Sequence, residues 1–189
     1  MTIDWVLLDI EASSLHQGGF PIEIAWIDDR GVEATHLIRP EPTWREWSYA
    51  SECVHHIPYD TVVTEGESAA EVAREIVSDL SQGKTIYSDN PEFDGRWLGM
   101  LLAAAGFDPQ ALLILDLVAL EAKFMVPVLH NFPRSFREEN KRIRLLAHEH
   151  ADRTSPRTHR ALADVKRHVV MIRETERLVA DRLAGGSDG

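Results

Sequence analysis

The feature that most constrains the fold is a hydrophobic run near the N-terminus, residues 6–15, which carries two carboxylates just before the first loop. Side chains alternate across a β-strand, so Asp9 and Glu11 project from one face and Ile10 from the other. Two adjacent carboxylates repel each other, and one pKa rises unless a cation lies between them. Because Mg²⁺ and similar hard cations prefer carboxylate oxygen, the run predicts a strand that presents a metal-binding pair; the alternative is a solvated strand end.

Length and composition predict a single α/β domain. The chain has 189 residues, of which 44% are hydrophobic, and this suffices for one well-buried core. We expect the domain over residues 1–183 and a disordered tail over residues 184–189. Cys53 is the only cysteine, which excludes an internal disulfide. Without a signal-peptide pattern or a membrane-spanning run of ~18 apolar residues, the expected location is cytoplasmic, with no membrane partner.

The charge is unevenly distributed. The formal net charge is −11, but residues 1–120 hold 6 Lys and Arg against 21 Asp and Glu, whereas residues 121–170 hold 11 against 6. A basic segment on an acidic body can bind nucleic acid, with fewer phosphate contacts than a dedicated duplex-binding protein makes. The alternative is a solvated loop and helix face.

The first third of the chain predicts the antiparallel opening of a sheet. Residues 20–28 alternate as a second strand, and a turn at Asp29-Arg30-Gly31 leads into a third strand over residues 32–38. Two prolines then end this meander. In the segment 43–59 we expect the aromatic side chains to cover the sheet edge rather than to stack on bases.

The rest of the chain alternates helices and strands. Helical spacing of apolar residues predicts helices over 68–80, 91–105, 116–124 and 159–183, and short apolar segments predict strands at 85–87 and 112–115. Residues 126–158 contain three prolines and several basic residues, which suggests a substrate-facing loop or short helix. The pattern predicts an α/β fold with a mixed sheet flanked by helices.

Two further motifs add carboxylates to the pair on the first strand. Asp94 lies in the first turn of a helix after a strand expected beside that of Asp9. His159 and Asp164 begin the last helix, and since a separation of five residues suits one helical face poorly, His159 is expected in the preceding turn, over Asp164. If the motifs do not meet, Asp94 is a helix-capping acid and the other two are a surface pair.

In this order the motifs resemble those of the DEDDh exonucleases, a group that includes ribonuclease T, oligoribonuclease and the proofreading subunit of bacterial DNA polymerase III. The resemblance rests on Asp9-Ile10-Glu11, on Asn90 through Phe93-Asp94, and on His159-x4-Asp164, and it spans about residues 3–180. Ile22-Glu23-Ile24 matches the second strand usual in the group. The resemblance implies a ribonuclease H-like, mixed five-stranded sheet, with an antiparallel meander followed by parallel strands.

The resemblance also implies an activity. It is that of a metal-dependent 3′–5′ exonuclease that hydrolyses single-stranded or short RNA or DNA with a free 3′ end and releases nucleoside 5′-monophosphates. Asp9, Glu11, Asp94 and Asp164 would hold two divalent cations, Mg²⁺ or Mn²⁺, with Asp9 between them. His159 would be the general base toward the attacking water. A homodimer is a further expectation from the group.

Residues in and beside these motifs are candidates for substrate binding, by contact with terminal bases or, in the basic segment, with phosphates. They are Ser14, Leu15, His16, Asn90, Phe93, Arg137 and Lys141. Residues 127–157 match no known recognition element, so the choice between RNA and DNA stays open.

Two other functions compete with this one. A phosphodiesterase for dinucleotides or very short oligomers would suit the acidic body. A catalytically silent adaptor would bind nucleic acid or a protein without chemistry, although a binding module gains nothing from concentrated carboxylate repulsion.

Overall fold

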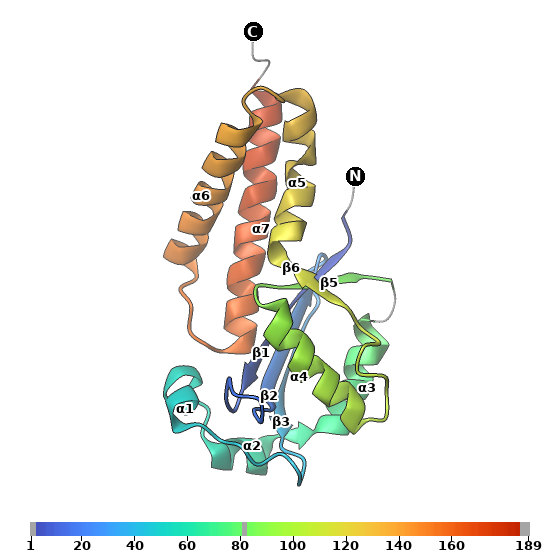
Figure 1. Ribbon diagram of the computed structural model, residues 1–189. Coiled ribbons are helices and arrows are strands. Elements are labelled where there is room, and N and C mark those ends of the chain that lie inside the picture. The colour runs from blue at the N-terminus through green and yellow to red at the C-terminus, as the bar shows by residue number, and fades with distance from the viewer. Residues whose placement is uncertain (1–2, 81–82, 186–189) are drawn as a thin grey trace.

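A mixed six-stranded sheet forms the centre of the computed structural model, which describes residues 3–80 and 83–185 (Figure 1). Strands β1 (Trp5–Ala12), β2 (Pro21–Asp28) and β3 (Glu33–Arg39) form the predicted antiparallel meander. Strand β5 (Thr85–Ser88) pairs in parallel with β1, and β6 (Ile114–Asp116) pairs in parallel with β5. The predicted α/β class with a mixed sheet flanked by helices is confirmed.

The sheet has one strand more than the five that were expected. Strand β4 (Glu67–Ser68) pairs in parallel with the end of β3 and completes the order β4-β3-β2-β1-β5-β6. Two residues carry no measurable alternation of hydrophobicity, so this strand has no sequence signature of its own.

Helices cover both faces of the sheet. Helices α3 (Ala69–Leu80) and α4 (Pro91–Ala104) pack on the face of Val6, Leu8 and Ile10, while α5 (Leu117–Asn131) and α7 (Ala161–Ala184) pack on the face of Trp5 and Leu7. The alternation along β1 therefore separates the two cores. Two short helices, α1 (Tyr49–His55) and α2 (Tyr59–Glu65), complete the fold.

Most of the segment 126–158 is helical, in place of the predicted loop or short helix. Helix α5 continues through Pro127 to Asn131, and α6 (Phe136–Thr154) runs beside α7 (Figure 1). The buried residues of α6 are only Ile143, Ala147 and Ala151. Such a narrow stripe of mostly small side chains packs against one neighbouring helix and gives a weak periodic signal.

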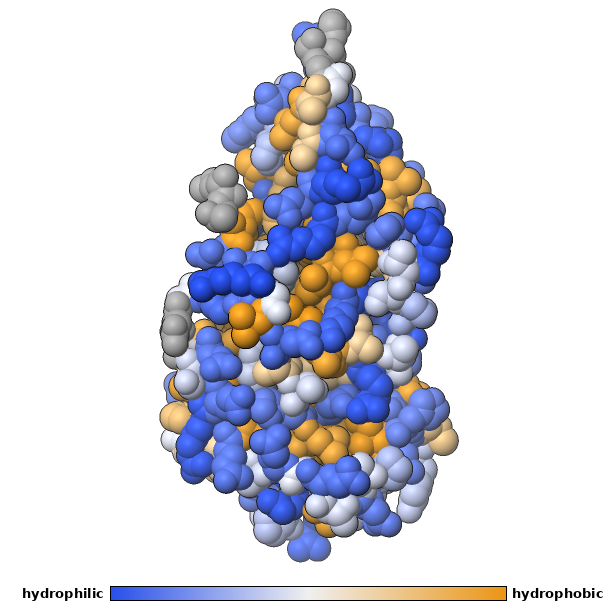
Figure 2. Space-filling model, turned by 180° about the vertical axis from the view of Figure 1, so that it is seen from behind, coloured by the Kyte–Doolittle hydropathy of each residue, from blue (hydrophilic) through white to orange (hydrophobic). Residues whose placement is uncertain are grey.

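The last helix extends past the predicted domain boundary at residue 183, because α7 ends at Ala184. The rest of the predicted tail, residues 186–189, lies outside the described residues. Within residues 3–80 and 83–185, each helix is too short or too polar to cross a membrane. On the face shown in Figure 2, hydrophobic side chains form separate patches divided by hydrophilic ones.

Candidate active site

Strand β1 and helix α4 bring the first three predicted acids together. Asp9 and Glu11 lie near the C-terminal end of β1, opposite Ala25 and Glu23 of β2. Because β5 runs parallel to β1, helix α4 begins at the same edge of the sheet, and Asp94 in its first turn is buried there. The predicted convergence of two motifs thus follows from the parallel pairing of β1 with β5.

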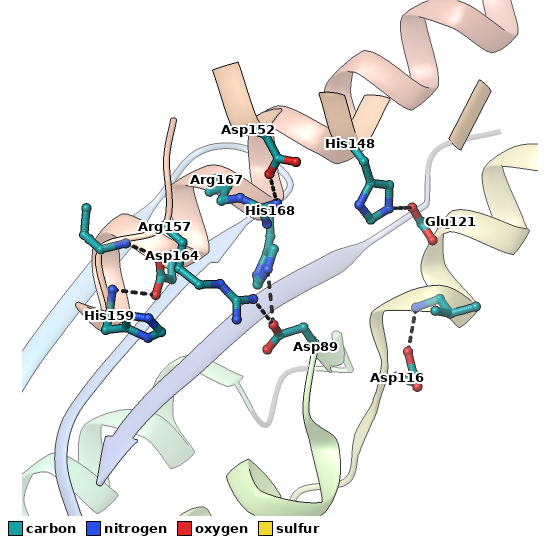
Figure 3. Close-up of polar contacts among 12 residues, drawn as sticks. Asp89, Asp116, Glu121, His148, Asp152, Arg157, His159, Asp164, Arg167 and His168 are labelled. Atoms are coloured by element: carbon teal, nitrogen blue, oxygen red, sulfur yellow. Dashed lines mark hydrogen bonds and ion pairs between the residues drawn. The ribbon is translucent and has the colours of Figure 1, made fainter. Parts of the chain in front are cut away.

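The turn before α7 adds the third motif. The carboxylate of Asp164 accepts hydrogen bonds from the backbone N–H groups of Thr158 and His159, each at 3.1 Å (Figure 3). His159 adopts a left-handed backbone conformation with φ 54°. A nitrogen of its ring lies within 4.8 Å of a carboxylate oxygen of Asp164. As predicted, His159 precedes the helix rather than sharing a face of it.

The acidic groups form two clusters that face one pocket. The ligand atoms of Glu11, His159 and Asp164 lie within 4.8 Å of one another, and so do those of Asp9, Asp89 and Asp94. All six residues line a pocket of about 490 Å³. Asp89 is absent from the sequence-based set, although it directly precedes Asn90 of the second motif.

Burial and mutual repulsion raise the pKa values of these acids. Burial, together with Asp94 and Glu11, raises the pKa of Asp9 well above its ordinary value. Burial and the nearby Asp164 and Glu23 raise the pKa of Glu11 to about 7. Burial, with Asp89 and Glu11 adding to it, raises the pKa of Asp94 to about 8. Such shifts are typical of carboxylates that lack a neutralising partner.

The donor set fits divalent cations. Asp94 Oδ2 is buried and has no hydrogen-bond partner among the described residues, so this oxygen has a lone pair left for a ligand. Hard divalent ions prefer carboxylate oxygen, and a bound cation would reverse the repulsion that raises the pKa of each acid. Asp9, Glu11, Asp94 and Asp164 are therefore suited to hold such ions, with Asp89 within reach.

Glu23 of β2 forms hydrogen bonds with the residues at the start of α7, beside the pocket. Its carboxylate accepts hydrogen bonds from Arg160 Nη2 at 2.6 Å and from the backbone N–H of Ala161 at 2.8 Å. Glu23 is buried, and Arg160 offsets the cost of burying its carboxylate with a bidentate contact. The apolar-acidic-apolar pattern of β2 singled out Glu23, but only the structure assigns this contact.

Asp89 lies beside the side chains of Arg157 and His168. Arg157 Nη2 lies 2.7 Å from Asp89 Oδ2, and His168 Nε2 lies 3.6 Å from the same oxygen (Figure 3). His168 is buried, and burial lowers its pKa. Arg157 comes from the turn that also holds His159, so Asp89 joins the β5–α4 junction to that turn.

Solved structures resemble this fold, although no protein-family model and no curated protein matches the sequence. A structure of exonuclease I aligns with a TM-score of 0.68 at 19% identity, over 97% of this chain and 44% of that chain. E. coli exonuclease I in complex with a dT13 oligonucleotide aligns with a TM-score of 0.67 at 18% identity, over 97% of this chain and 43% of that chain. Its zinc-bound complex with single-stranded DNA aligns with a TM-score of 0.66 at 18% identity, over 98% of this chain and 43% of that chain.

The chain has the exonuclease I fold. This finding confirms, at the level of fold, the predicted resemblance to the DEDDh exonucleases. The chain spans less than half the length of exonuclease I, so the comparison applies to one part of that enzyme.

Three predicted substrate residues line the pocket and two beside them do not. Leu15, Asn90 and Phe93 are among the lining side chains. Ser14 is buried, and its hydroxyl donates to Glu46 Oε1 at 2.8 Å. The exposed His16 also lies outside the lining, so the structure does not bring Ser14 and His16 to the pocket.

Arg137 and Lys141 lie away from the pocket. Both are exposed near the N-terminal end of α6, where Glu139 accepts a hydrogen bond from Arg182 in the last turn of α7. Asp164 is in the first turn of α7, at its opposite end. At a rise of 1.5 Å per residue, Lys141 is about 20 Å along α6 from the end that approaches the pocket.

Helix α1 supplies lining residues that the sequence did not indicate. His55 is buried, and its Nδ1 accepts a hydrogen bond from the backbone N–H of Ile57 at 3.1 Å. Burial lowers the pKa of His55 to about 4, so this imidazole is neutral at physiological pH. Trp97 of α4 lines the same pocket. Of the aromatic residues predicted to cover the sheet edge, Trp44 packs within the chain, where it stacks on the buried Phe20.

Proposed function

We propose that this protein is a 3′–5′ exonuclease that hydrolyses phosphodiester bonds at the end of single-stranded or short nucleic acid. The observation that carries the proposal is the convergence of Asp9, Glu11, Asp94, Asp164 and His159 on one pocket. Three separate motifs, from the two ends and the middle of the chain, meet there. The structures of exonuclease I in complex with oligonucleotides support a single-stranded substrate.

Two divalent cations, Mg²⁺ or Mn²⁺, are part of this proposal. Asp9 and Asp94 would hold one ion, Glu11 and Asp164 the other, and Asp9 would reach both. Bound there, the ions would stabilise the charge that develops on the entering and leaving oxygens of the phosphodiester. The unpartnered Asp94 Oδ2 and the raised pKa values of three acids support this assignment.

His159 is the general base in this proposal. Its side chain is exposed to the pocket solvent, while its backbone is held by Asp164. An imidazole so placed can accept the proton of the attacking water and release it to solvent. Glu23 and Arg160 keep the turn in place from the other side, so they position the base without touching the substrate.

The pocket suits the terminal nucleotide of a strand. Its volume of about 490 Å³ falls in the range of small-molecule sites, roughly 300 to 1,000 Å³. Leu15 and Phe93 offer apolar surface on which a base can stack, and Leu15 is 66% exposed. Hydrolysis there would release nucleoside 5′-monophosphates one at a time.

One observation favours a short substrate, such as a dinucleotide. Several basic residues of the segment 121–170 pair with acids of the chain itself, including Arg144 with Glu121, Arg160 with Glu23 and Arg167 with Asp152. Paired side chains contribute little to a phosphate-binding track. Dimerisation and a cytoplasmic location stay predictions, and the choice between RNA and DNA stays open.

The test is product analysis on matched 5′-end-labelled RNA and DNA oligonucleotides of two to about twenty nucleotides with Mg²⁺ or Mn²⁺. We expect a ladder that shortens from the 3′ end and nucleoside 5′-monophosphate as product. Cleavage confined to dinucleotides would favour the phosphodiesterase, and robust activity in excess EDTA would refute the metal-dependent mechanism.

A further inference from the structure

A second group of metal-ligating side chains lies outside the pocket. It consists of His36 on β3, Glu67 on β4 and Glu75 on α3, and their ligand atoms lie within 4.8 Å of one another. None of the three residues lines the pocket of the acidic clusters. His36 pairs across the sheet with Ile24, whose side chain packs on the α3 and α4 face, whereas Asp9 and Glu11 project from the opposite face.

The ring of His36 is held in one orientation. It stacks on Trp26, with ring centroids 5.3 Å apart, and its side chain is 9% exposed. Nδ1 lies 2.9 Å from Glu67 Oε1, which is the distance of an N–H···O hydrogen bond. A proton on Nδ1 leaves Nε2 with a lone pair, and a carboxylate that fixes a histidine in this way commonly supports a metal ligand.

The other ring nitrogen faces a carboxylate without a hydrogen bond. Nε2 is buried, has no hydrogen-bond partner among the described residues, and lies 3.4 Å from Glu75 Oε1. A lone pair that faces a carboxylate is repulsive, so a cation between the two atoms would stabilise them. A tetrahedral ion bonded to both at ~2.1 Å would separate them by about 3.4 Å. The observed separation therefore matches the separation expected around a bound ion.

We propose that His36 Nε2 and Glu75 bind a transition-metal ion of the Zn²⁺ class, with Glu67 orienting the ring. Imidazole is a poor ligand for Mg²⁺ and a good one for Zn²⁺, so this site differs in metal preference from the four carboxylates proposed to hold the ions of the pocket. The glutamates are about half exposed, which leaves room for water to complete the coordination. The ion would join β3 to α3, while the hydrogen bond between His36 and Glu67 links β3 to the edge strand β4.

The proposal is independent of the exonuclease activity and is tested by zinc binding. Because the pocket acids also bind metals, the measurements use the Asp9→Asn/Asp94→Asn background. In that background, Glu75→Gln is compared with Asp79→Asn, which removes an exposed charge from the same helix outside the cluster. Equilibrium dialysis against ZnCl₂ in excess Mg²⁺ should give one Zn²⁺ per chain fewer for Glu75→Gln than for Asp79→Asn.

A second readout identifies the ligand. In ¹H–¹⁵N correlation spectra of the imidazole groups, added Zn²⁺ should shift the Nε2 resonance of His36 in the background protein and leave it unshifted in Glu75→Gln. Zinc should also raise the melting temperature of the background protein more than that of Glu75→Gln. Equal zinc content in the two variants, or a His36 Nε2 resonance that does not shift when zinc is added to the background protein, would overturn the proposal. This holds whether or not the protein is a nuclease.

Discussion

The acids of the pocket and the acids of the long helices have opposite surroundings. On α6 and α7, a hydrogen bond from Arg167 lowers the pKa of Asp152, and one from Arg177 lowers that of Glu174. In the pocket, burial and neighbouring carboxylates raise the pKa of Asp9, Glu11 and Asp94. These acids of α6 and α7 are thus paired with arginine side chains. In the pocket, at the C-terminal end of β1, neighbouring carboxylates repel one another and destabilise the metal-free fold. Such an arrangement indicates a site adapted to a ligand and not to stability.

Removing Asp9 is the strongest test of this contrast. Asp9→Ala should lower the single-turnover rate by at least about 10⁴-fold, because the metals supply several kcal/mol of transition-state stabilisation. Loss of one repelling carboxylate should leave the metal-free melting temperature level or raise it. A large drop in the metal-free melting temperature, measured by circular dichroism, would instead assign Asp9 to the core.

Replacing the base should have the next largest effect. His159→Asn should reduce the single-turnover rate by roughly 10² to 10⁴, the usual contribution of a positioned acid-base group, while substrate affinity stays level. Rapid-quench kinetics measure the single-turnover rate, and a separate binding assay measures the substrate affinity. His130→Asn, at the far end of α5, is the matched control and should retain full activity. A rate that is unchanged in His159→Asn would exclude the base role.

Loosening the start of α7 should have an intermediate effect. Glu23→Gln weakens the contact to Arg160 and keeps the size of the side chain, so the turn that holds His159 should become less well positioned. We expect a rate loss of about 10-fold with little change in KM, since a small displacement of a catalytic group is costly. A change in KM alone would place Glu23 in substrate binding.

The pH dependence of stability tests the raised pKa values. Asp94 has a pKa of about 8 in the folded chain against 3.8 for the ordinary group, so the folded state binds more protons between these values. Its contribution should therefore destabilise the metal-free protein progressively as pH rises through this window. In EDTA, the melting temperature should fall by a few °C from about pH 5 to pH 8.

A paired measurement isolates the residue responsible. Asp94→Asn should make this dependence shallower, and Asp79→Asn, which changes an exposed acid of α3, should preserve it. Added Mg²⁺ should also flatten it in the wild type. An identical slope in Asp94→Asn would show that other groups cause the pH dependence.

The smallest effect is expected from the basic end of α6. Replacing both Arg137 and Lys141 by Ala should leave affinity unchanged within about twofold, because these residues lie far from the pocket. If Arg137 and Lys141 each contacted a phosphate of a single strand, the two contacts would contribute about 1.4 to the slope of log K against log salt, and the double variant would lose that contribution. Arg157→Ala, in the pocket lining, is the comparison and should reduce that slope by less than about 0.7, because Arg157 already pairs with Asp89. A flatter slope in the double variant would place α6 on the substrate path.

The sequence by itself determined the local features of this protein. Alternation along β1 set Asp9 and Glu11 on one face and Ile10 on the other, and the spacing of His159 and Asp164 predicted a turn before the last helix. These properties depend on neighbours two to five residues apart, so the periodicity of strands and helices suffices to predict them.

Only the tertiary structure decided which distant groups meet. The contact of Glu23 with the start of α7 and the approach of Asp89 to Asp9 each join segments far apart in sequence, and the path of α6 away from the pocket depends on how it packs beside α7. Hydrophobic periodicity predicts which face of a helix is buried, but it does not predict which element packs against that face. The basic charge of residues 121–170 was therefore visible in the sequence, whereas its position relative to the acids depended on how α5, α6 and α7 pack.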